Sequence, residues 1–392
     1  MATRTTTIRP IPIMSVVCAK IMFNFKEIYE AYLNCRKRKR NTINALHYEA
    51  NLIVNLCNLE TSLNLGTYKP KRSVCFLTTS PKLREVFAAD FSDRVVHHIV
   101  VSILEQIWEP CFIHDSYSNR KNRGIHAAKN RAEHFMRGSR YYLQLDVKSF
   151  FYSINKEILW QKLKSKIVKE YHKVKDTDVQ MHEMLTVLHA IVWQDVTQNV
   201  VIKGERKSFE QIPSHKTLFK LPKYKGLPIG NLTSQFFANV YMDDFDNFVK
   251  RKLKVKRYLR YVDDFVLFSD SKEELMEHYI QMVKYLENEL ELTLRDKYIL
   301  KGNKEGLDFL GYVIRPHYTL VRRRVVHNYK YKKAQYLDRY EALEGTMKLA
   351  EIKQFLSVQA SFAGHTKHAN SYNLNQKIGV LNETNPFDYV RA

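Results

Sequence analysis

Two adjacent aspartates interrupt an apolar and aromatic run in the second half of the chain. Asp263 and Asp264 stand inside the run from Tyr258 to Phe268 (YLRYVDDFVLF). The aromatic and β-branched residues on either side predict two short strands that meet at the aspartates. Because burying an unpaired carboxylate is costly unless a cation binds it, the pattern predicts a tight hairpin whose tip holds a metal site.

A second pair of aspartates, in Tyr241–Asp244 (YMDD), looks nearly the same as a string. Its surroundings differ, because after Asn231 the apolar residues recur at helical spacing. We expect a helix there, with Asp243, Asp244 and Asp246 largely on its solvated face. In this interpretation the pair at 263–264 is the functional one.

The chain carries 63 Lys and Arg residues against 41 Asp and Glu, a formal charge of +22. Such an excess favours a polyanionic partner, because neutralising phosphates releases their counterions. A merely soluble basic protein is the alternative, and the clustering of the charge argues against it. Basic residues gather at Arg36–Arg40, Lys250–Arg260 and Arg322–Lys333, with tyrosines interleaved in the last two. This mixture suits phosphate contacts and stacking on nucleic acid.

The five cysteines are odd in number and show no C-x-x-C spacing. They predict a reducing, cytoplasmic setting and argue against a zinc site. The mildly apolar stretch from Ile11 to Phe25 is broken by Lys20 and is too short to span a bilayer. We therefore expect no membrane partner.

Hydrophobic periodicity predicts a mixed α+β chain without internal repeats. The connection at 194–225 is long and irregular and has the look of an inserted segment, and loops of this length tend to be functional. The expected elements are two helices within Phe25–Leu65, a strand at Val74–Leu77, helices at Asp90–Trp108 and Ala127–Met136, a strand at Tyr141–Asp146, helices at Lys156–Tyr171, Val179–Val192 and Lys272–Leu290, strands at Leu292–Leu300 and Asp308–Ile314, and basic helices after His317.

A strand that ends at Asp146 brings a third carboxylate from a distant part of the chain. Magnesium takes one or two protein carboxylates and fills its octahedron with water, backbone carbonyl and phosphate oxygens. Two such ions about 3.5–4 Å apart can activate an attacking hydroxyl and stabilise a leaving pyrophosphate. The composition of the basic loop Ser116–His126 fits a triphosphate-binding loop and a solvated surface loop equally well. These parts predict a nucleotidyl transferase, and a nuclease would also fit.

Four motifs in order resemble those of reverse transcriptases. They are Leu145–Phe151 (LDVKSFF), Gly226–Gly230 (GLPIG), Tyr261–Asp264 (YVDD) and Phe309–Tyr312 (FLGY). The resemblance covers roughly Lys69 to Ile314, and several ordered motifs are far more specific than one Y-x-D-D. It implies a right-hand polymerase fold of fingers, an antiparallel palm sheet with helices, and a helical thumb. The implied regions are an N-terminal arm and helical fingers extension at 1–69, fingers at 70–140, a palm at 141–315 with an insertion near 194–225, and a basic thumb at 316–392.

Residue roles follow from the resemblance alone. Asp146 and Asp263 would bind two Mg²⁺ ions, or Mn²⁺ in their place, with Asp264 assisting and the Val147 carbonyl completing one shell. Phe151 would exclude a ribose 2′-hydroxyl, with core packing as the alternative. The remaining implied roles are triphosphate binding by Arg120, contact with the nascent pair by Ile229 and Gly230, protonation of pyrophosphate by Lys297, and a primer grip made by Phe309, Leu310 and Gly311.

Two departures bear on the biological role. Many reverse transcriptases have Gln where this chain has Ile229, and the form here resembles the error-prone enzymes of diversity-generating retroelements. The 194–225 segment and the basic N-terminal arm resemble additions in the bacterial antiphage "unknown group", which like retrons is compact. The leading expectation is thus a prokaryotic, RNA-templated DNA polymerase that copies a dedicated non-coding RNA in antiphage defence. Its expected partners are the RNA template, dNTPs, the DNA product, and an accessory protein or a second copy of the chain.

Two alternatives stay open. One is an error-prone enzyme that serves diversification. The other is a catalytically idle RNA-binding scaffold, and the retained Asp146, Asp263 and Asp264 argue against it.

Overall fold

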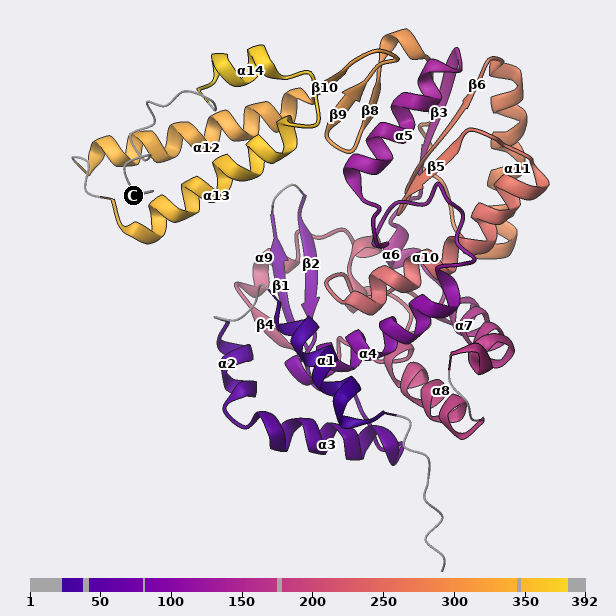
Figure 1. The fold of residues 1–392 in the computed structure, drawn as a ribbon, viewed down its shortest axis with the longest axis vertical. Helices are drawn as coiled ribbons and strands as arrows, with labels where there is room; N and C mark the ends of the chain where they lie inside the picture. The colour runs from indigo at the N-terminus through magenta and orange to yellow at the C-terminus, as the bar shows by residue number, and fades with distance from the viewer. Residues whose placement is uncertain (1–22, 38–41, 80–81, 175–177, 344–346, 380–392) are drawn as a thin grey trace, which may run out of the picture.

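The computed structural model describes residues 23–37, 42–79, 82–174, 178–343 and 347–379. Three small sheets are joined and covered by helices (Figure 1). The helices α12 to α14 extend from one end of the molecule, and α1 to α3 lie at the other end. This mixture of helix and sheet agrees with the α+β right-hand fold that the resemblance predicts.

The N-terminal layer holds three helices where two were expected. The first begins at a capping box in which the Asn24 side chain accepts from the Glu27 amide and the Glu27 carboxylate accepts from the Asn24 amide. Arg36 donates to Glu49 and so clamps the first helix to the second. The predicted N-terminal arm begins in residues 1–22, which lie outside the described residues. The three helices are α1 (Phe25–Arg36), α2 (Ile43–Glu49) and α3 (Leu52–Asn64), and α4 (Phe91–Trp108), which follows β2 in the chain, packs against α1 and α2.

A three-stranded sheet in the order β2-β1-β4 stands beside this layer. Its hairpin is antiparallel, whereas β4 comes from the 194–225 connection and pairs in parallel, with Val201 opposite Val74. The buried Glu85 carboxylate accepts hydrogen bonds from Thr217 Oγ1 at 2.8 Å and from the Leu218 amide. The predicted insertion is therefore built into the sheet. Its elements are β1 (Val74–Thr78), β2 (Arg84–Ala88), β4 (Val201–Lys203) and the short helix α9 (Arg206–Phe209).

The central sheet has four antiparallel strands in the order β5-β6-β3-β7. Alternate residues face two cores: Leu143 and Phe265 pack towards α10 and α11, and Tyr142 and Phe268 pack towards α5. The strand predicted at Tyr141–Asp146 is confirmed. The strands are β3 (Tyr141–Asp146), β5 (Tyr258–Tyr261), β6 (Asp264–Ser269) and β7 (Ile299–Gly302). The helices around them are α5 (Ile125–Arg137), α6 (Phe150–Ser153), α7 (Lys156–Glu170), α8 (Asp178–Val192), α10 (Leu232–Asn247) and α11 (Lys272–Leu290).

A third sheet, in the order β10-β9-β8, joins the central sheet to the C-terminal helices. The single strand predicted at Asp308–Ile314 is wrong, because Leu310 (φ 52°) and Gly311 (φ 89°) form a two-residue turn inside it. Positive φ at both turn residues is the mark of the tightest hairpins. The strands are β8 (Leu307–Phe309), β9 (Tyr312–Ile314) and β10 (Thr319–Val321).

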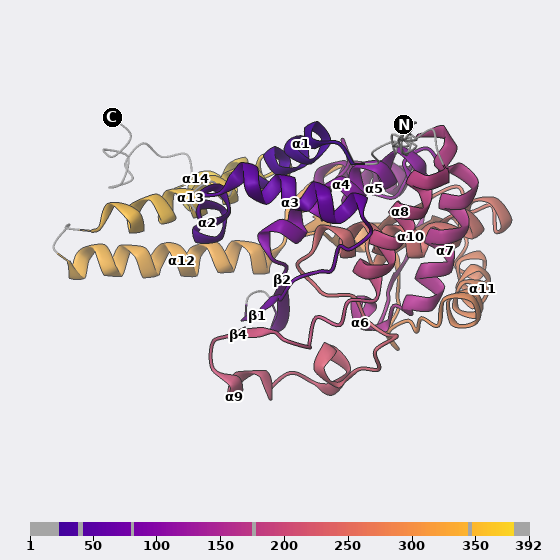
Figure 2. The ribbon, with the colours of Figure 1, turned by 90° about the horizontal axis from the view of Figure 1, so that it is seen from below.

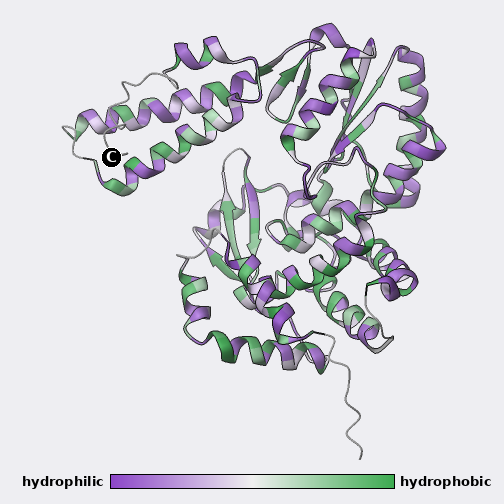
Figure 3. Ribbon diagram, in the orientation of Figure 1, coloured by the Kyte–Doolittle hydropathy of each residue, from purple (hydrophilic) through white to green (hydrophobic). Residues whose placement is uncertain are grey.

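The C-terminal region after β10 is helical over its described residues, as predicted. Figure 2 shows its two long helices reaching away from the sheets, and hydrophilic bands recur along α12 in Figure 3. Of the helices within the described ranges, none combines the length and the hydrophobicity that a membrane span needs. The helices are α12 (Arg323–Ala342), α13 (Leu349–Thr366) and α14 (Tyr372–Lys377).

Candidate functional site

The three predicted catalytic aspartates meet at one end of the central sheet. Asp146 ends β3, and its register partner is Asp264 at the start of β6. Opposed residues of an antiparallel pair point to the same face. Asp263 precedes Asp264 in the hairpin turn, and its carbonyl accepts a hydrogen bond of 3.1 Å from the Val147 amide. The hairpin predicted from YVDD is therefore confirmed, and its tip is tied to the end of β3.

Burial and mutual repulsion raise the pKa values of these carboxyl groups. Burial and then the charge of Asp263 raise the pKa of Asp146 to about 6, although the cations Arg295 and Lys82 oppose the shift. Burial raises the pKa of Asp264 to about 7, against the hydrogen bonds of 3.0 and 3.2 Å that its oxygens accept from Gln144. The pKa of Asp263 is also raised by burial. A bound cation would favour the ionised forms of these three groups.

The donor set fits a hard divalent cation. Within the described ranges, no three His, Cys, Asp or Glu side chains are grouped closely enough to enclose a metal ion. Magnesium requires only one or two protein carboxylates, with water and phosphate oxygens filling its other positions. Asp146 and Asp263, whose charges interact, meet that requirement. Asp264 is held by Gln144 instead.

The Val147 carbonyl lies next to this carboxylate pair in the chain. Val147 forms an isolated bridge with Leu294. The hydrogen bonds that frame this bridge run from the Arg295 amide to the Asp146 carbonyl and from the Lys148 amide to the Thr293 carbonyl, and neither uses the Val147 carbonyl. Its predicted role as a metal ligand stays a prediction.

The backbone at the hairpin tip is strained at Val262, and a hydrogen bond from Arg260 supports it. Val262 has φ 58°, a left-handed conformation that is costly for a β-branched residue. The Arg260 guanidinium donates from Nη1 to the Val262 carbonyl at 2.9 Å. Its Nε and Nη2 donate to Asp246 on α10, and each side chain of this pair is 1% exposed.

This ion pair corrects the expectation that Asp243, Asp244 and Asp246 lie on a solvated face. Asp246 and Asp243 are buried, because Arg260 and Lys166 supply cations to that side of α10. Asp244 is the exposed member of the three and pairs with Lys162. The helix predicted for the YMDD string is therefore confirmed, but Asp243 within the string and Asp246 just after it are buried.

A cavity of about 260 Å³ opens beside Asp263. Phe151 and Ile229 line it, as their predicted roles require. The Ile229 carbonyl accepts from the Phe87 amide at 2.8 Å, which ties the GLPIG loop to β2. Gly230 has φ 119°, and a Cβ there would lie 2.8 Å from the Phe87 carbonyl oxygen. Only glycine fits this close approach of loop and strand.

Four cationic side chains line the same cavity, and the sequence interpretation missed all of them. Lys82 and Arg84 come from the β1–β2 hairpin, Lys216 from the 194–225 connection, and Arg295 from the chain before β7. Arg295 Nε lies 3.1 Å from Asp146 Oδ1. The missed signal is that Arg84 begins a second strand two residues after Lys82, and periodicity did not predict that strand.

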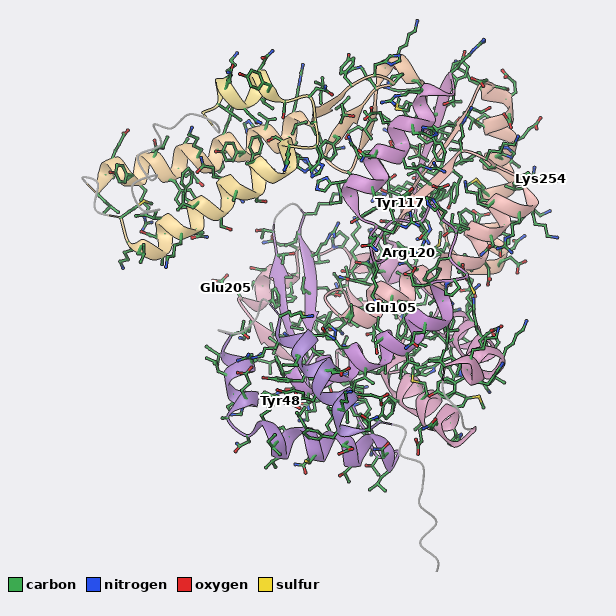
Figure 4. The ribbon with its side chains drawn as sticks, viewed as in Figure 1. Tyr48, Glu105, Tyr117, Arg120, Glu205 and Lys254 are labelled. Atoms are coloured by element: carbon green, nitrogen blue, oxygen red, sulfur yellow. The ribbon has the colours of Figure 1, made fainter. Side chains whose placement is uncertain are left out.

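Two predicted site residues lie elsewhere. The Arg120 side chain is 5% exposed and donates to Glu109 and to the carbonyls of Ile113 and Ser116, in the interior beside α4 (Figure 4). With these donors engaged, Arg120 does not fit the predicted contact with a triphosphate. Lys297 is exposed and is not among the residues that line the cavity, whereas Arg295 is.

The predicted primer-grip residues form the β8–β9 turn. Phe309 is buried, while Leu310 and Gly311 make the turn itself. The Gly311 carbonyl lies 3.3 Å from His365 Nε2 on α13, and Tyr312 stacks on the His365 ring at 4.2 Å between centroids. This turn therefore connects the central sheet to the C-terminal helices.

A family model described as reverse transcriptase (RNA-dependent DNA polymerase) matches residues 69–314. Group II intron-encoded protein LtrA of Lactococcus lactis is 27% identical over 293 residues, which are 65% of this chain and 48% of LtrA. Protein YkfC of Escherichia coli K12 is 23% identical over 335 residues, 75% of this chain and 80% of YkfC. The chain thus spans about half the length of LtrA.

Solved structures with a similar outline include two telomerases. The Candida albicans telomerase, in complex with a fragment of telomeric RNA, gives a TM-score of 0.43 at 11% identity over 82% of this chain and 57% of that one. The apo Candida tropicalis telomerase gives 0.44 at 10% identity over 69% and 60%. Because these scores are low, the family assignment rests on the match over 69–314.

Proposed function

The chain belongs to the reverse transcriptase family, and we propose that it copies an RNA template into DNA by adding nucleotides from dNTPs to a primer 3′-hydroxyl. One observation carries this proposal: Asp146, Asp263 and Asp264 meet at one end of the central sheet, and Asp263 lines a cavity that four cationic side chains also line. Carboxylates suit metal ions and cations suit a triphosphate, so the arrangement serves phosphoryl transfer.

Reverse transcriptases generally use divalent metal ions. We assign two Mg²⁺ ions, or Mn²⁺, to Asp146 and Asp263 with the Val147 carbonyl. When bound, such ions activate the attacking hydroxyl and stabilise the departing pyrophosphate. Gln144 orients Asp264, and Arg295 orients Asp146. Side chains that contact and orient a metal ligand in this way usually tune the affinity for the metal.

The cavity would hold the incoming dNTP. Lys82, Arg84 and Lys216 supply positive charge for its triphosphate in place of Arg120. Phe151 stands on the wall of the cavity, where an aromatic ring would exclude a ribose 2′-hydroxyl. Ile229 presents an apolar side chain to the nascent pair, and Gly230 allows the loop to lie against β2.

The remaining regions take the roles that the resemblance implies. We assign the fingers to 70–140, with a helical extension before them, the palm to 141–315 and the thumb to 316–392. The β8–β9 turn, with Phe309, Leu310 and Gly311, would grip the primer, because it links the catalytic sheet to α13. Basic residues of α12 would follow the duplex backbone, so that RNA template and DNA product lie between turn and thumb.

The biological role we propose is defence against phage, with a dedicated non-coding RNA as template. The support is the 194–225 segment, an addition that the minimal diversifying enzymes lack. An error-prone diversifying enzyme is the second candidate, favoured by Ile229. Sequencing the nucleic acid that co-purifies with the protein separates the two: a single repeated RNA with its DNA copy supports the first, and a spectrum of mutated copies supports the second.

A primer-extension assay tests the catalytic proposal. Wild-type protein with Mg²⁺, dNTPs and an RNA template is expected to extend a DNA primer, and Asp263→Ala is expected to abolish extension. Asp244→Asn is the matched control, because it removes an exposed aspartate from the similar string and is expected to retain activity. Equal activity of wild type and Asp263→Ala would defeat the proposed mechanism. Absence of extension by all three proteins, with RNA binding retained, would favour the scaffold reading.

A further inference from the structure

The 194–225 connection walls a second pocket, of about 300 Å³, which the proposed chemistry does not use. It lies on the other side of the GLPIG loop from the catalytic cavity: Gly226 and Pro228 line the second pocket, and Ile229 lines the first. The connection also contributes to both, with Lys216 in the catalytic cavity and Phe219 in the second pocket. Figure 2 shows the part of the connection around α9 looping out beside β4.

The second pocket is cationic. Lys156, Lys223 and Lys225 line it, against the single carboxylate of Asp195. Lys225 Nζ also lies 3.4 Å from Glu291 Oε2. The Asp195 carboxylate interacts electrostatically with Lys156 and Lys223. One positive charge of the three is therefore left over after both acidic neighbours are counted.

Lys156 is the unusual member of this group. It is the first residue of α7 and only 6% exposed, and its Nζ donates at 3.4 Å to the Gln194 carbonyl. Burial lowers the pKa of this amine, and Asp195 partly opposes the shift. A cation at a helix N-terminus is disfavoured by the helix dipole, whereas an anion placed there is favoured. A phosphate in the pocket would give the buried Lys156 amine a counter-charge.

Aromatic side chains accompany the lysines. Phe219 is 40% exposed and Tyr224 is 48% exposed. The stretch 215–225 (HKTLFKLPKYK) holds four lysines and no acidic residue. Exposed rings interleaved with lysines suit unpaired nucleic acid, because the rings stack on bases that a duplex would hide and the lysines bind the backbone.

The connection is held firmly in place. Hydrogen bonds from Thr217 and Leu218 to Glu85, and the pairing of Val201 with Val74, tie it to the β1–β2 hairpin. The Lys156 amide donates to the Tyr224 carbonyl at 2.8 Å, which fixes the backbone of Tyr224 between Lys223 and Lys225, two residues that line the pocket. A site ordered before binding loses less entropy when its ligand binds.

We propose that this second pocket binds single-stranded template RNA immediately before it passes the GLPIG loop into the catalytic cavity. The proposal rests on the function proposed above, because it takes the occupant of the catalytic cavity to be the copied template. Lys156 and Lys223 would hold a backbone phosphate, and Tyr224 would stack on an unpaired base. Stacking is tolerant of sequence, so the site would accept any template.

Photo-crosslinking tests the location. A primer–template duplex carries about ten unpaired template nucleotides ahead of the primer end, with 4-thiouridine at successive positions. Illumination followed by peptide mapping is expected to attach the unpaired template to the peptide that contains Tyr224. Crosslinks that fall only on other segments would overturn the proposal.

Binding measurements test the energetics. Fluorescence anisotropy compares the affinity for a primer–template with that overhang and for one with a single unpaired nucleotide. The gain in affinity from the overhang is expected to fall about fivefold or more in Lys223→Ala/Tyr224→Ala, as loss of one stacked base predicts. Lys26→Ala/Tyr29→Ala on α1 removes the same residue types and is expected to keep the gain. Equal gains in all three proteins would overturn the proposal.

Two further measurements distinguish failure of this inference from failure of the proposed function. Primer extension on the single-nucleotide overhang does not engage the second pocket, so the Lys223→Ala/Tyr224→Ala protein should match wild type there. If wild type extends no primer, the proposed function fails, and the affinity gain still reports on the pocket. Competition by inorganic phosphate or free nucleotide as effective as that by the RNA overhang would show a small-anion site and overturn the template assignment.

Discussion

Arg260 donates a hydrogen bond of 2.9 Å from Nη1 to the carbonyl of Val262. The guanidinium that binds Asp246 on α10 thus also holds the strained residue at the tip of the catalytic hairpin. A helix carboxylate that never meets substrate therefore supports the position of Asp263.

Asp246→Asn should lower the free energy of unfolding by about 3–5 kcal/mol, because it leaves Arg260 buried without a counter-charge. Asp244→Asn, two residues earlier, should cost less than ~1 kcal/mol, since its partner Lys162 binds it at the surface. Urea denaturation followed by circular dichroism measures both. If both variants lose the same free energy of unfolding, the buried Arg260–Asp246 pair contributes no more to stability than the surface pair.

Arg295→Ala should reduce primer extension by about 10–100-fold, because Arg295 holds Asp146 from outside the metal site. Lys297→Ala should stay within about twofold of wild type, as expected for an exposed side chain that touches no reacting group. Steady-state extension rates at saturating dNTP give the comparison. A larger loss in Lys297→Ala would restore the predicted acid role of Lys297.

We expect Arg84 to bind the triphosphate in place of Arg120, to which the motif comparison gave that role. Arg84→Ala should raise the KM for dNTP about tenfold or more, because it removes a charged contact from the cavity, and should leave stability unchanged. Arg120→Ala should lower the free energy of unfolding by about 3 kcal/mol, because it strands the partly buried Glu109 and two carbonyls. Measuring KM and urea denaturation on both variants decides between the two assignments.

Asp93 predicts a pH dependence of stability. Burial raises its pKa from 3.8 to about 6, against hydrogen bonds from the Lys71 amide and Tyr68, a shift equivalent to ~3 kcal/mol. The folded state therefore binds the proton more tightly, and this contribution to stability is present below pH 4 and lost as the pH rises through about 6.

Asp93→Asn cannot lose that proton, and its amide can keep both hydrogen bonds. Relative to wild type, the variant should be more stable at pH 8 than at pH 5. Urea denaturation of both proteins at several pH values measures the difference. A difference that does not change with pH would place the Asp93 pKa at its ordinary value.

Ile229→Gln should change the error spectrum of the DNA product, because it places an amide beside the nascent pair. The loop itself should be unaffected, since the contact with Phe87 uses the Ile229 backbone. Sequencing of products made from one defined template measures the effect. Identical spectra would remove Ile229 from any account of fidelity.

Local patterns predicted much of this architecture. The helix at Lys272–Leu290 and the strand at Tyr141–Asp146 have the predicted bounds, because each has a clear period and ends at a turn or cap. The catalytic hairpin was predictable because carboxylates in an apolar strand need a cation. The turn at Leu310 was not predictable, because leucine rarely adopts positive φ and only Gly311 marked the site.

Contacts between distant residues account for the rest. Asp246 looked exposed because its partner, Arg260, lies on a later strand, and neither residue's neighbours reveal the pair. Arg120 sits in a basic, turn-rich loop that resembles a phosphate site, yet Glu109 takes its donors. Lys82 and Arg84 reach the cavity only because β2 pairs with β1 and the GLPIG loop docks on Phe87.

The parallel pairing of β4 with β1 has a consequence for any shortened form of the protein. Removing the 194–225 connection would uncover the outer edge of β1, including Cys75 and Phe76, with its backbone amides and carbonyls unpaired. An uncovered strand of this kind is a template on which other chains pair, so it leads to aggregation. Truncation for crystallisation or delivery would thus produce an insoluble protein before it revealed what the connection binds.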